Sequence, residues 1–307
     1  MNTDKIKIQT WFVTGASSGI GYEMCKQLLN RGYNVIAVAR RIPSFHDDKA
    51  LCLSVDVTNE DEIKKAFSEG ISRFGSIDVL INNAGISSNL TFEEISNEEM
   101  RNVIEVNYWG AYNTMKIFLP YFREKKYGTI INNTSQSGIS VRAFGAAYCS
   151  SKHALEGLTA VIWHEAQRFC RVMAIELGFF PGTEVLKNHS RKGTQIPEYK
   201  GIPLFYKKYD RNFTNNLTLA INSVIDTVEK DKLPRRLILG KDALIQISTE
   251  VDYILSDLKN SKERALACSI PNKEYVLSLF GINFFKQKTF PTYKLYTLFG
   301  INIKVRK

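Results

Sequence analysis

The sequence predicts an α/β protein built on a doubly wound, Rossmann-like parallel sheet in three layers (αβα), with a C-terminal tail. Apolar segments of strand length alternate with amphipathic segments of helix length. Strands such as Val35–Val38 are apolar throughout, as expected for burial on both faces. A glycine-rich turn joins the first predicted strand to the first predicted helix, and 307 residues with 44% hydrophobic content can bury a substantial core.

Six strands and four helices are predicted in the first part of the chain. The strands are Thr10–Val13, Asn34–Ala39, Leu51–Val55, Val79–Asn82, Thr129–Asn132 and Arg171–Leu177. The helices are Gly19–Arg31, Glu60–Phe74, Asn97–Arg123 and Ser151–Phe169. Ligands of such sheets bind at the carboxyl ends of the strands, so functional residues are expected there.

The alternation of strands and helices stops after Pro181, where a polar, basic segment runs to about Arg211 and is expected to form a loop with short helices. Helices follow at Asn215–Val228 and Leu244–Leu258, on either side of a strand at Arg236–Leu239. We expect one catalytic domain, residues 1–265, and a basic, aromatic tail, residues 266–307.

The net charge of +10 is concentrated in the tail, where residues 270–307 hold seven basic residues and one acid. Removing that +6 from +10 leaves about +4, which is ordinary for a soluble enzyme, so no nucleic-acid partner is expected. The five cysteines form no CxxC pair, and His153 and His164 lack partners at ligand spacing, so no metal site is expected. No segment approaches the roughly 18 to 20 apolar residues of a membrane span, which predicts a cytoplasmic protein.

The glycine-rich turn Thr14–Gly21, which reads TGASSGIG, lies between a strand and a helix. Glycines at such a junction let the backbone approach a pyrophosphate, whose charge the helix N-terminus favours. The alternative is a turn with a purely structural role.

Tyr148 and Lys152 are four residues apart and would share one face of a helix. An ammonium group there can stabilise a phenolate and so lower the pKa of the tyrosine, which suits a proton donor to a reduced carbonyl. Ser135 follows a predicted strand and can donate a hydrogen bond to the substrate oxygen. The alternative is an ordinary surface pair of tyrosine and lysine.

These motifs, with Asn82–Gly85 (NNAG) and the YxxxK of Tyr148–Lys152, resemble the short-chain dehydrogenase/reductase family, in its shorter reductase branch, up to about residue 265. The resemblance implies hydride transfer between a nicotinamide and a carbonyl or secondary alcohol. It implies four catalytic residues: Ser135, Tyr148, Lys152 and Asn107. It implies cofactor contacts at Gly15, Ser17, Ser18, Gly19, Ile20, Gly21, Asp56, Val57, Asn83, Ala84, Gly85, Tyr148, Lys152, Pro181, Gly182 and Thr183. It also implies a homodimer or homotetramer.

One motif departs from the family pattern PGxxxT, because Leu186 stands where the family has a threonine that contacts the cofactor. Thr183 is the substitute we expect.

The end of the second strand indicates which nicotinamide cofactor is used. Arg40 and Arg41 stand where an enzyme that uses NAD carries an acid, and guanidinium groups suit the 2′-phosphate of NADP. The sequence therefore predicts NADP(H), with solvated surface arginines as the alternative.

The tail contains an internal repeat, because Leu279–Asn283 (LFGIN) recurs as Leu298–Asn302. Aromatic residues interleaved with lysines suit a segment at a membrane surface. The tail also resembles tails of bacterial surface-polysaccharide glycosyltransferases, which implies attachment to the inner face of the membrane or to a pathway complex. The alternative is a tail that packs on its own or a neighbouring subunit.

The substrate class is open to more than one prediction. The basic loop suits a phosphorylated or nucleotide-linked compound, and the tail suggests a sugar-related compound of surface-glycan synthesis. The basic loop carries Lys187, His189, Arg191, Lys192, Lys200, Lys207 and Lys208. Alternatives are a steroid- or retinol-like reductase of apolar ketones, a nucleotide-sugar epimerase or dehydratase of the family's extended branch, and a non-catalytic scaffold that binds NADPH.

Overall fold

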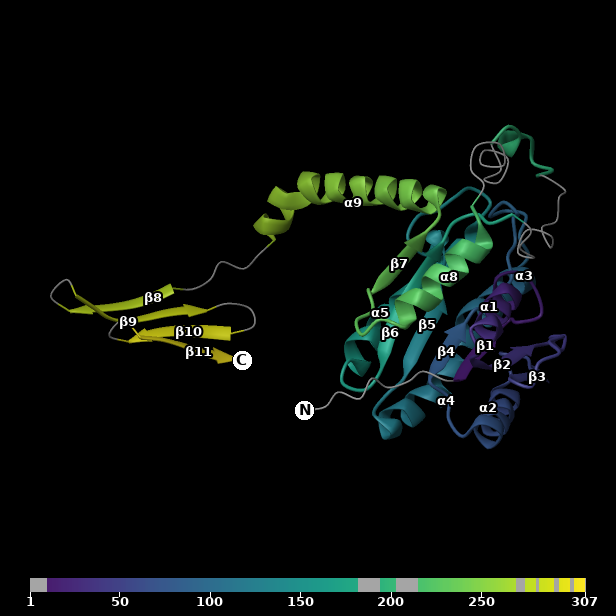
Figure 1. The fold of residues 1–307 in the computed structure, drawn as a ribbon. Coiled ribbons are helices and arrows are strands. Elements are labelled where there is room, and N and C mark those ends of the chain that lie inside the picture. Colours follow the sequence, from purple (N-terminus) through teal and green to yellow (C-terminus); the bar gives the residue numbers. More distant parts are fainter. Residues whose placement is uncertain are drawn as a thin grey trace. The chain divides into compact units, whose positions relative to one another are not determined.

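The computed structural model describes residues 10–181, 194–202 and 215–268, together with the backbone of four strands between residues 274 and 306 (Figure 1). The chain divides into two compact units, residues 1–251 and 252–307. The division falls inside helix α9, Lys241–Ala267, which also contains the expected domain boundary at residue 265. The two units are described separately below.

The first unit is built on a seven-stranded sheet in which every pairing is parallel, which confirms the predicted fold class. The strand order is β3-β2-β1-β4-β5-β6-β7. The strands are β1 Thr10–Thr14, β2 Asn34–Ala39, β3 Ala50–Ser54, β4 Val79–Asn82, β5 Thr129–Asn133, β6 Arg171–Leu177 and β7 Arg236–Leu239. The order reverses between β1 and β4, which creates the crevice where such sheets bind ligands.

Helices cover both faces of this sheet (Figure 1). On one face α1, Gly19–Asn30, and α8, Leu217–Val228, pack on a buried cluster that includes Trp11 and Val13. On the other face α2, α4 and α5 pack on a second cluster that includes Phe12. These helices are α2 Glu60–Phe74, α4 Gly110–Lys125 and α5 Ala146–Ala166. Alternate residues of β1 therefore face opposite layers, as the continuous apolar strands predict.

Helix α2 shows how local sequence sets the ends of these elements. The Asn59 side chain accepts hydrogen bonds from the amides of Asp61 and Glu62, and acids fill the first turn. Gly75, with φ of 79°, ends the helix in a conformation that glycine adopts without steric cost. The predicted bounds of α2 are confirmed, because the residues that begin and end the helix, Asn59 and Gly75, directly flank it in the sequence.

Three predicted helices differ most from the observed ones, and one of them is the helix predicted at Leu244–Leu258, which is observed as the longer α9, Lys241–Ala267. The expected helix Asn97–Arg123 is α3, Asn97–Ile104, a π-helical turn, Glu105–Trp109, and then α4. Helix α5 begins at Ala146, five residues before the expected Ser151. It therefore contains both Tyr148 and Lys152.

The second unit contains a four-stranded antiparallel sheet, which the sequence did not predict. Its strands are β8 Glu274–Leu279, β9 Ile282–Thr289, β10 Tyr293–Leu298 and β11 Ile301–Arg306, in the order β11-β10-β9-β8. Each copy of the LFGIN repeat contains the end of one strand and the start of its antiparallel neighbour. The repeated motif thus marks the two positions at which one strand of an antiparallel pair ends and the other begins.

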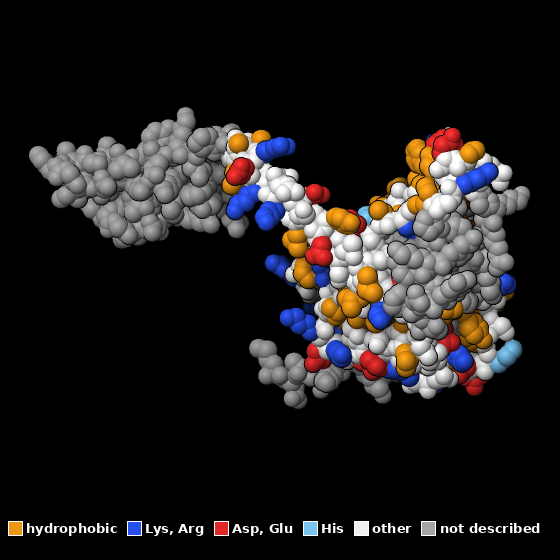
Figure 2. All heavy atoms as spheres, turned by 90° about the horizontal axis from the view of Figure 1, so that it is seen from above, with side chains coloured by type: hydrophobic (Ala, Val, Ile, Leu, Met, Phe, Trp, Pro, Cys, Tyr) orange, Lys and Arg blue, Asp and Glu red, His pale blue; other side chains and the backbone are white. Residues whose placement is uncertain are grey.

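Charged side chains of both signs are interspersed with hydrophobic ones on the face seen in Figure 2. Within the described part of the chain, every helix is too short or too polar to cross a membrane.

Candidate active site

A cavity of about 410 Å³ lies at the carboxyl ends of β1, β4, β5 and β6. This volume is within the range of small-molecule and cofactor sites. The expected residues Gly15, Ser17, Ser18, Gly19, Ile20, Arg40, Arg41, Asp56, Val57, Asn83, Ala84, Gly85, Ser135, Tyr148 and Lys152 all line it. Motifs spread over more than 130 positions of the sequence thus meet at one site.

The glycine-rich turn forms one end of this cavity. Gly15 and Gly19 have φ of 67° and 54°, which favour glycine. A Cβ on Gly21 would lie 2.3 Å from the Gly15 carbonyl oxygen, so only glycine lets the helix begin this close to the strand. The N-cap residue Ser18 makes no side-chain cap, and the first turn of α1 has no acid, so its amides suit an anion.

The side of the cavity next to β2 and β3 carries charged residues. Arg40 and Arg41 are exposed, and Arg41 donates to the carbonyl oxygen of Ser17 at 3.3 Å, which links it to the glycine-rich turn. The Asp56 carboxylate accepts from the Thr58 amide at 2.9 Å and from its hydroxyl at 2.8 Å. Two guanidinium groups therefore border the cavity where an acid would bind the ribose of NAD.

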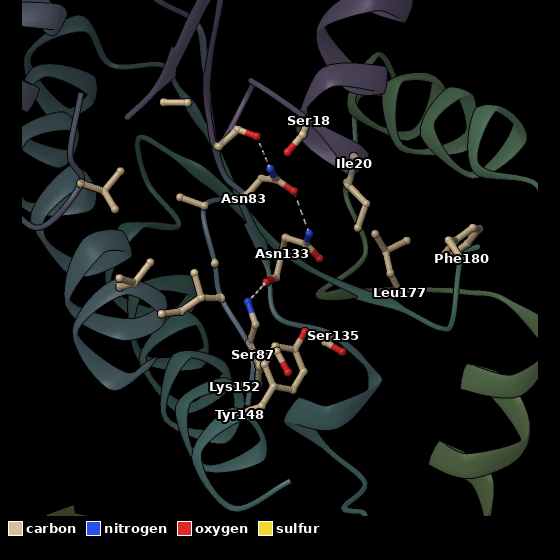
Figure 3. A pocket seen from close by; sticks show the side chains of 18 of the residues that line it. Ser18, Ile20, Asn83, Ser87, Asn133, Ser135, Tyr148, Lys152, Leu177 and Phe180 are labelled. Carbon is tan, nitrogen blue, oxygen red and sulfur yellow. Dashed lines mark hydrogen bonds between the residues drawn. The ribbon is translucent and has the colours of Figure 1, made fainter. Parts of the chain in front are cut away.

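A line of hydrogen bonds runs from the glycine-rich turn to the predicted catalytic lysine (Figure 3). Asn83 donates to the Thr14 carbonyl oxygen at 2.9 Å and accepts from the Asn133 side chain at 2.9 Å. The Lys152 ammonium donates to the Asn133 carbonyl oxygen at 2.6 Å. Asn133 was not among the residues predicted from the sequence, although its position at the end of β5 was a usable signal.

Tyr148, Lys152 and Ser135 lie together at the other end of this line (Figure 3). Tyr148 and Lys152 share one face of α5, with the Lys152 Nζ 5.8 Å from the centre of the Tyr148 ring. Ser135 forms a hydrogen bond with Tyr148. Its φ of 95° and ψ of 151° are rare for any residue but glycine, and such strain is typical of functional sites.

Burial raises the pKa of Tyr148, which differs from the expectation that Lys152 lowers it. The groups that partly offset burial are Ser135, through its hydrogen bond, and Arg142, through its charge. Burial also lowers the pKa of Lys152 to about 8, against the nearby charge of Glu176. A tyrosine with a raised pKa keeps its proton at neutral pH.

Asn107 is buried in the π-helical turn between α3 and α4. Its side chain accepts from the Ile86 amide at 2.8 Å and donates to the Ile86 carbonyl oxygen at 2.9 Å and to the Ser151 hydroxyl at 2.9 Å. It fixes the loop after β4 against α5 at Ile86, which is next to Gly85 and lines the cavity. Turns of this type are often found at functional sites.

The loop after β6 contributes Leu177, Gly178, Phe179 and Phe180 to the cavity wall. Pro181, Gly182 and Thr183 were the residues predicted here from the sequence. Pro181 is exposed and is not part of the wall, while Gly182 and Thr183 lie outside the described residues. Of the basic residues of the following loop the structure describes Lys200, which is exposed.

Comparisons with known proteins agree with this architecture. The family model for short chain dehydrogenases matches residues 9–193. An uncharacterized oxidoreductase of Schizosaccharomyces pombe is 30% identical over 280 residues, which cover 88% of this chain and 94% of that protein. An NADPH-dependent pterin aldehyde reductase of Arabidopsis thaliana is 31% identical over 59% of this chain and 78% of its own. A short-chain dehydrogenase structure from Streptomyces avermitilis matches with a TM-score of 0.79 at 27% identity, covering 86% of this chain and 100% of its own.

Proposed function

We propose that this chain, which belongs to the short-chain dehydrogenase family, is an NADPH-dependent reductase of carbonyl compounds in which Tyr148 is the general acid. The observation that carries the proposal is the grouping of Ser135, Tyr148 and Lys152 at one end of a cavity whose other end is the glycine-rich turn. A scaffold that only binds NADPH would have no need of this group.

The residues of the cavity fit a nicotinamide dinucleotide. A side chain on Gly21 would collide with Gly15, and the uncapped start of α1 suits the pyrophosphate. Asp56 and Val57 would border the adenine, and residues 83–85 would border the ribose next to it. Lys152 would contact the nicotinamide ribose. When bound, the dinucleotide supplies the hydride for reduction of the carbonyl.

The preference for NADPH rests on Arg40 and Arg41, because family membership does not settle it. A 3-ketoacyl-(acyl-carrier-protein) reductase of Brucella melitensis with the same fold was solved with NADH. Guanidinium groups recognise phosphate by paired, charge-assisted hydrogen bonds. Arg41 is already tied to Ser17 of the glycine-rich turn, so a 2′-phosphate would meet a partly ordered cation.

The side chains at the Tyr148 end divide the work of proton transfer. Tyr148 is protonated at neutral pH because burial raises its pKa, so it can donate to the oxygen of the reduced carbonyl. Ser135 holds the Tyr148 hydroxyl by a hydrogen bond. Lys152, whose pKa of about 8 is close to working pH, can exchange a proton with solvent more readily than an ordinary lysine.

A polar substrate, such as a sugar-related compound, agrees with the cavity wall better than an apolar ketone does. The Tyr148 end is lined by Ser87, Ser135, Gln136 and Ser137. The resemblance of the tail to those of surface-polysaccharide enzymes supports a role in surface-glycan synthesis.

The test is an assay of the purified full chain with NADPH or NADH against keto-sugars, sugar phosphates and apolar ketones. We expect Tyr148→Phe to lower kcat by at least about 100-fold with little change in the affinity for NADPH, since proton transfer contributes about that much. We expect the wild type to favour NADPH over NADH and Arg40→Asp to narrow or reverse that preference. Wild-type activity in Tyr148→Phe would refute the catalytic role, and equal use of both cofactors would refute the NADPH assignment.

A further inference from the structure

Arg142 lies on the short loop between the 3-10 helix Gln136–Gly138 and α5, and it lines the cavity. Its neighbours Val141 and Ala143 are exposed, Val141 to 64%, whereas Arg142 itself is half-buried. This is the reverse of the usual order, in which apolar side chains are covered and arginine is exposed. The loop therefore turns its cation toward the cavity at the cost of leaving valine in solvent.

The backbone after Arg142 is held in a tight turn. Phe144 has φ of 60°, a left-handed conformation that is uncommon for aromatic residues. A Cβ on Gly145 would lie 2.7 Å from the Cys149 sulfur and 3.0 Å from the Arg142 carbonyl oxygen. Close packing of the loop on the first turn of α5 thus fixes the position of the Arg142 backbone relative to Tyr148.

The Arg142 guanidinium carbon lies 5.5 Å from the centre of the Tyr148 ring. The other cation at this end, Lys152, is 4% exposed and donates to the Asn133 carbonyl oxygen. Among the described residues that line the cavity, the carboxylate is Asp56, which lies with Arg40 and Arg41 at the opposite end. The two charged side chains that line the Tyr148 end are therefore both basic, and Arg142 is the more exposed of the two.

The same cavity wall also holds two neutral groups that lack a hydrogen-bond partner in the described part of the chain. The side-chain oxygens of Gln136 and Ser87 are buried, and neither has a hydrogen-bond partner within the described residues. Gln136 is 3% exposed, and both residues line the cavity. Leaving such groups unpaired is costly, and hydroxyl groups of a ligand would satisfy them.

From this juxtaposition we propose that Arg142 makes the site selective for carbonyl substrates that carry an anionic group, a carboxylate or a phosphate. The proposal rests on the reductase function proposed above and names its substrate class. The guanidinium binds the anion by charge-assisted hydrogen bonds and so places the carbonyl next to Tyr148. A neutral carbonyl compound lacks this anchor.

Matched pairs of aldehydes test the proposal with the full chain and NADPH. One pair is 4-carboxybenzaldehyde and methyl 4-formylbenzoate, and the other is glyceraldehyde 3-phosphate and glyceraldehyde. We expect a higher kcat/KM for the anionic member of at least one pair, which also shows whether carboxylate or phosphate is preferred. Arg142→Gln should remove roughly 10- to 100-fold of that preference, as expected for a lost charge-assisted hydrogen bond, with Arg142→Lys between the two. Arg73→Gln, which removes an exposed cation on α2, is the matched control and should keep the preference.

The outcomes separate this proposal from the function on which it rests. Equal kcat/KM for both members of each pair in the wild type would overturn the proposal and leave the reductase function intact. An equal loss for charged and neutral aldehydes in Arg142→Gln would also overturn it, since Arg142 would then act only through Tyr148. If no aldehyde is reduced, calorimetric titration of the same pairs with NADP⁺ present decides: tighter binding of the anionic members that is lost in Arg142→Gln supports the proposal, and equal binding overturns it.

Discussion

Glu156 on α5 and Glu176 on β6 form a buried pair of carboxyl groups, and Glu176 lies near Lys152, the proposed catalytic lysine. Thr134 donates to Glu176 at 2.8 Å and Arg236 pairs with Glu156, while the Oε2 atom of each carboxyl group is buried and has no hydrogen-bond partner among the described residues. Burial and the neighbouring Glu156 raise the pKa of Glu176 to about 9. The pair therefore holds a proton at neutral pH, because two unprotonated carboxylates this close would repel each other.

This proton makes stability depend on pH. Between the ordinary glutamate pKa of about 4.3 and about 9, the folded state keeps a proton that the unfolded state has lost. The free energy of unfolding should therefore fall as pH rises through this window. In Glu176→Gln the amide can replace the carboxylic acid. We expect the free energy of unfolding of this variant, measured by urea unfolding from pH 5 to 9, to fall less steeply with pH than that of the wild type. Glu165 is exposed and lies on α5, as Glu156 does, so Glu165→Gln should show the pH dependence of the wild type. The same pH dependence in all three proteins would contradict the assignment of the bound proton to Glu156 and Glu176.

At the scale of elements, the junction of β1 and α1 decides whether the cavity can form. Gly21 is buried in the first turn of α1 against Gly15. The neighbouring Asn83 side chain would lie 2.5 Å from an added Cβ, so the same contact also supports the loop after β4. The strand-to-helix turn and the line of hydrogen bonds to Lys152 thus both depend on glycine, which has no side chain, at position 21.

Two glycine-to-alanine changes test this dependence. Gly21→Ala should push α1 away from β1, weaken NADPH binding by more than about 10-fold and lower stability by about 1–3 kcal/mol, as overpacked sites do. Gly157→Ala is the matched control on α5, because a Cβ there meets no atom within 4 Å. It should leave NADPH binding unchanged and raise stability by up to about 1 kcal/mol. Fluorescence titration of NADPH and urea unfolding measure both effects, and wild-type binding in Gly21→Ala would contradict the argument.

The residues that line the cavity belong to the first unit, while the LFGIN repeat belongs to the second. Apolar and basic residues alternate in the sequence of β11, which reads INIKVR. We propose that this sheet attaches the enzyme to an anionic membrane surface, where apolar insertion and basic charge act together.

Deletion of residues 270–307 tests the attachment. The truncated chain keeps every residue of the cavity wall, so it should bind NADPH with wild-type affinity. It should lose binding to phosphatidylglycerol vesicles in a sedimentation assay, whereas the full chain should bind them more than phosphatidylcholine vesicles. Equal sedimentation of the full and truncated chains would refute the membrane role without affecting the reductase proposal.

Local sequence pattern predicts the strand and helix order of the first unit, the glycine-rich turn and the shared helix face of Tyr148 and Lys152, since periodicity and turn residues act over a few positions. The sequence also predicts that the motifs up to Gly85 lie together at one cavity, because they end strands whose carboxyl ends must meet. It missed the strands of the tail. The contribution of Arg142, Asn133 and the segment Leu177–Phe180 to the cavity wall, and the effect of burial on the pKa of Tyr148, became visible in the folded structure. Those properties depend on which distant residues surround a side chain, and local pattern carries no record of that.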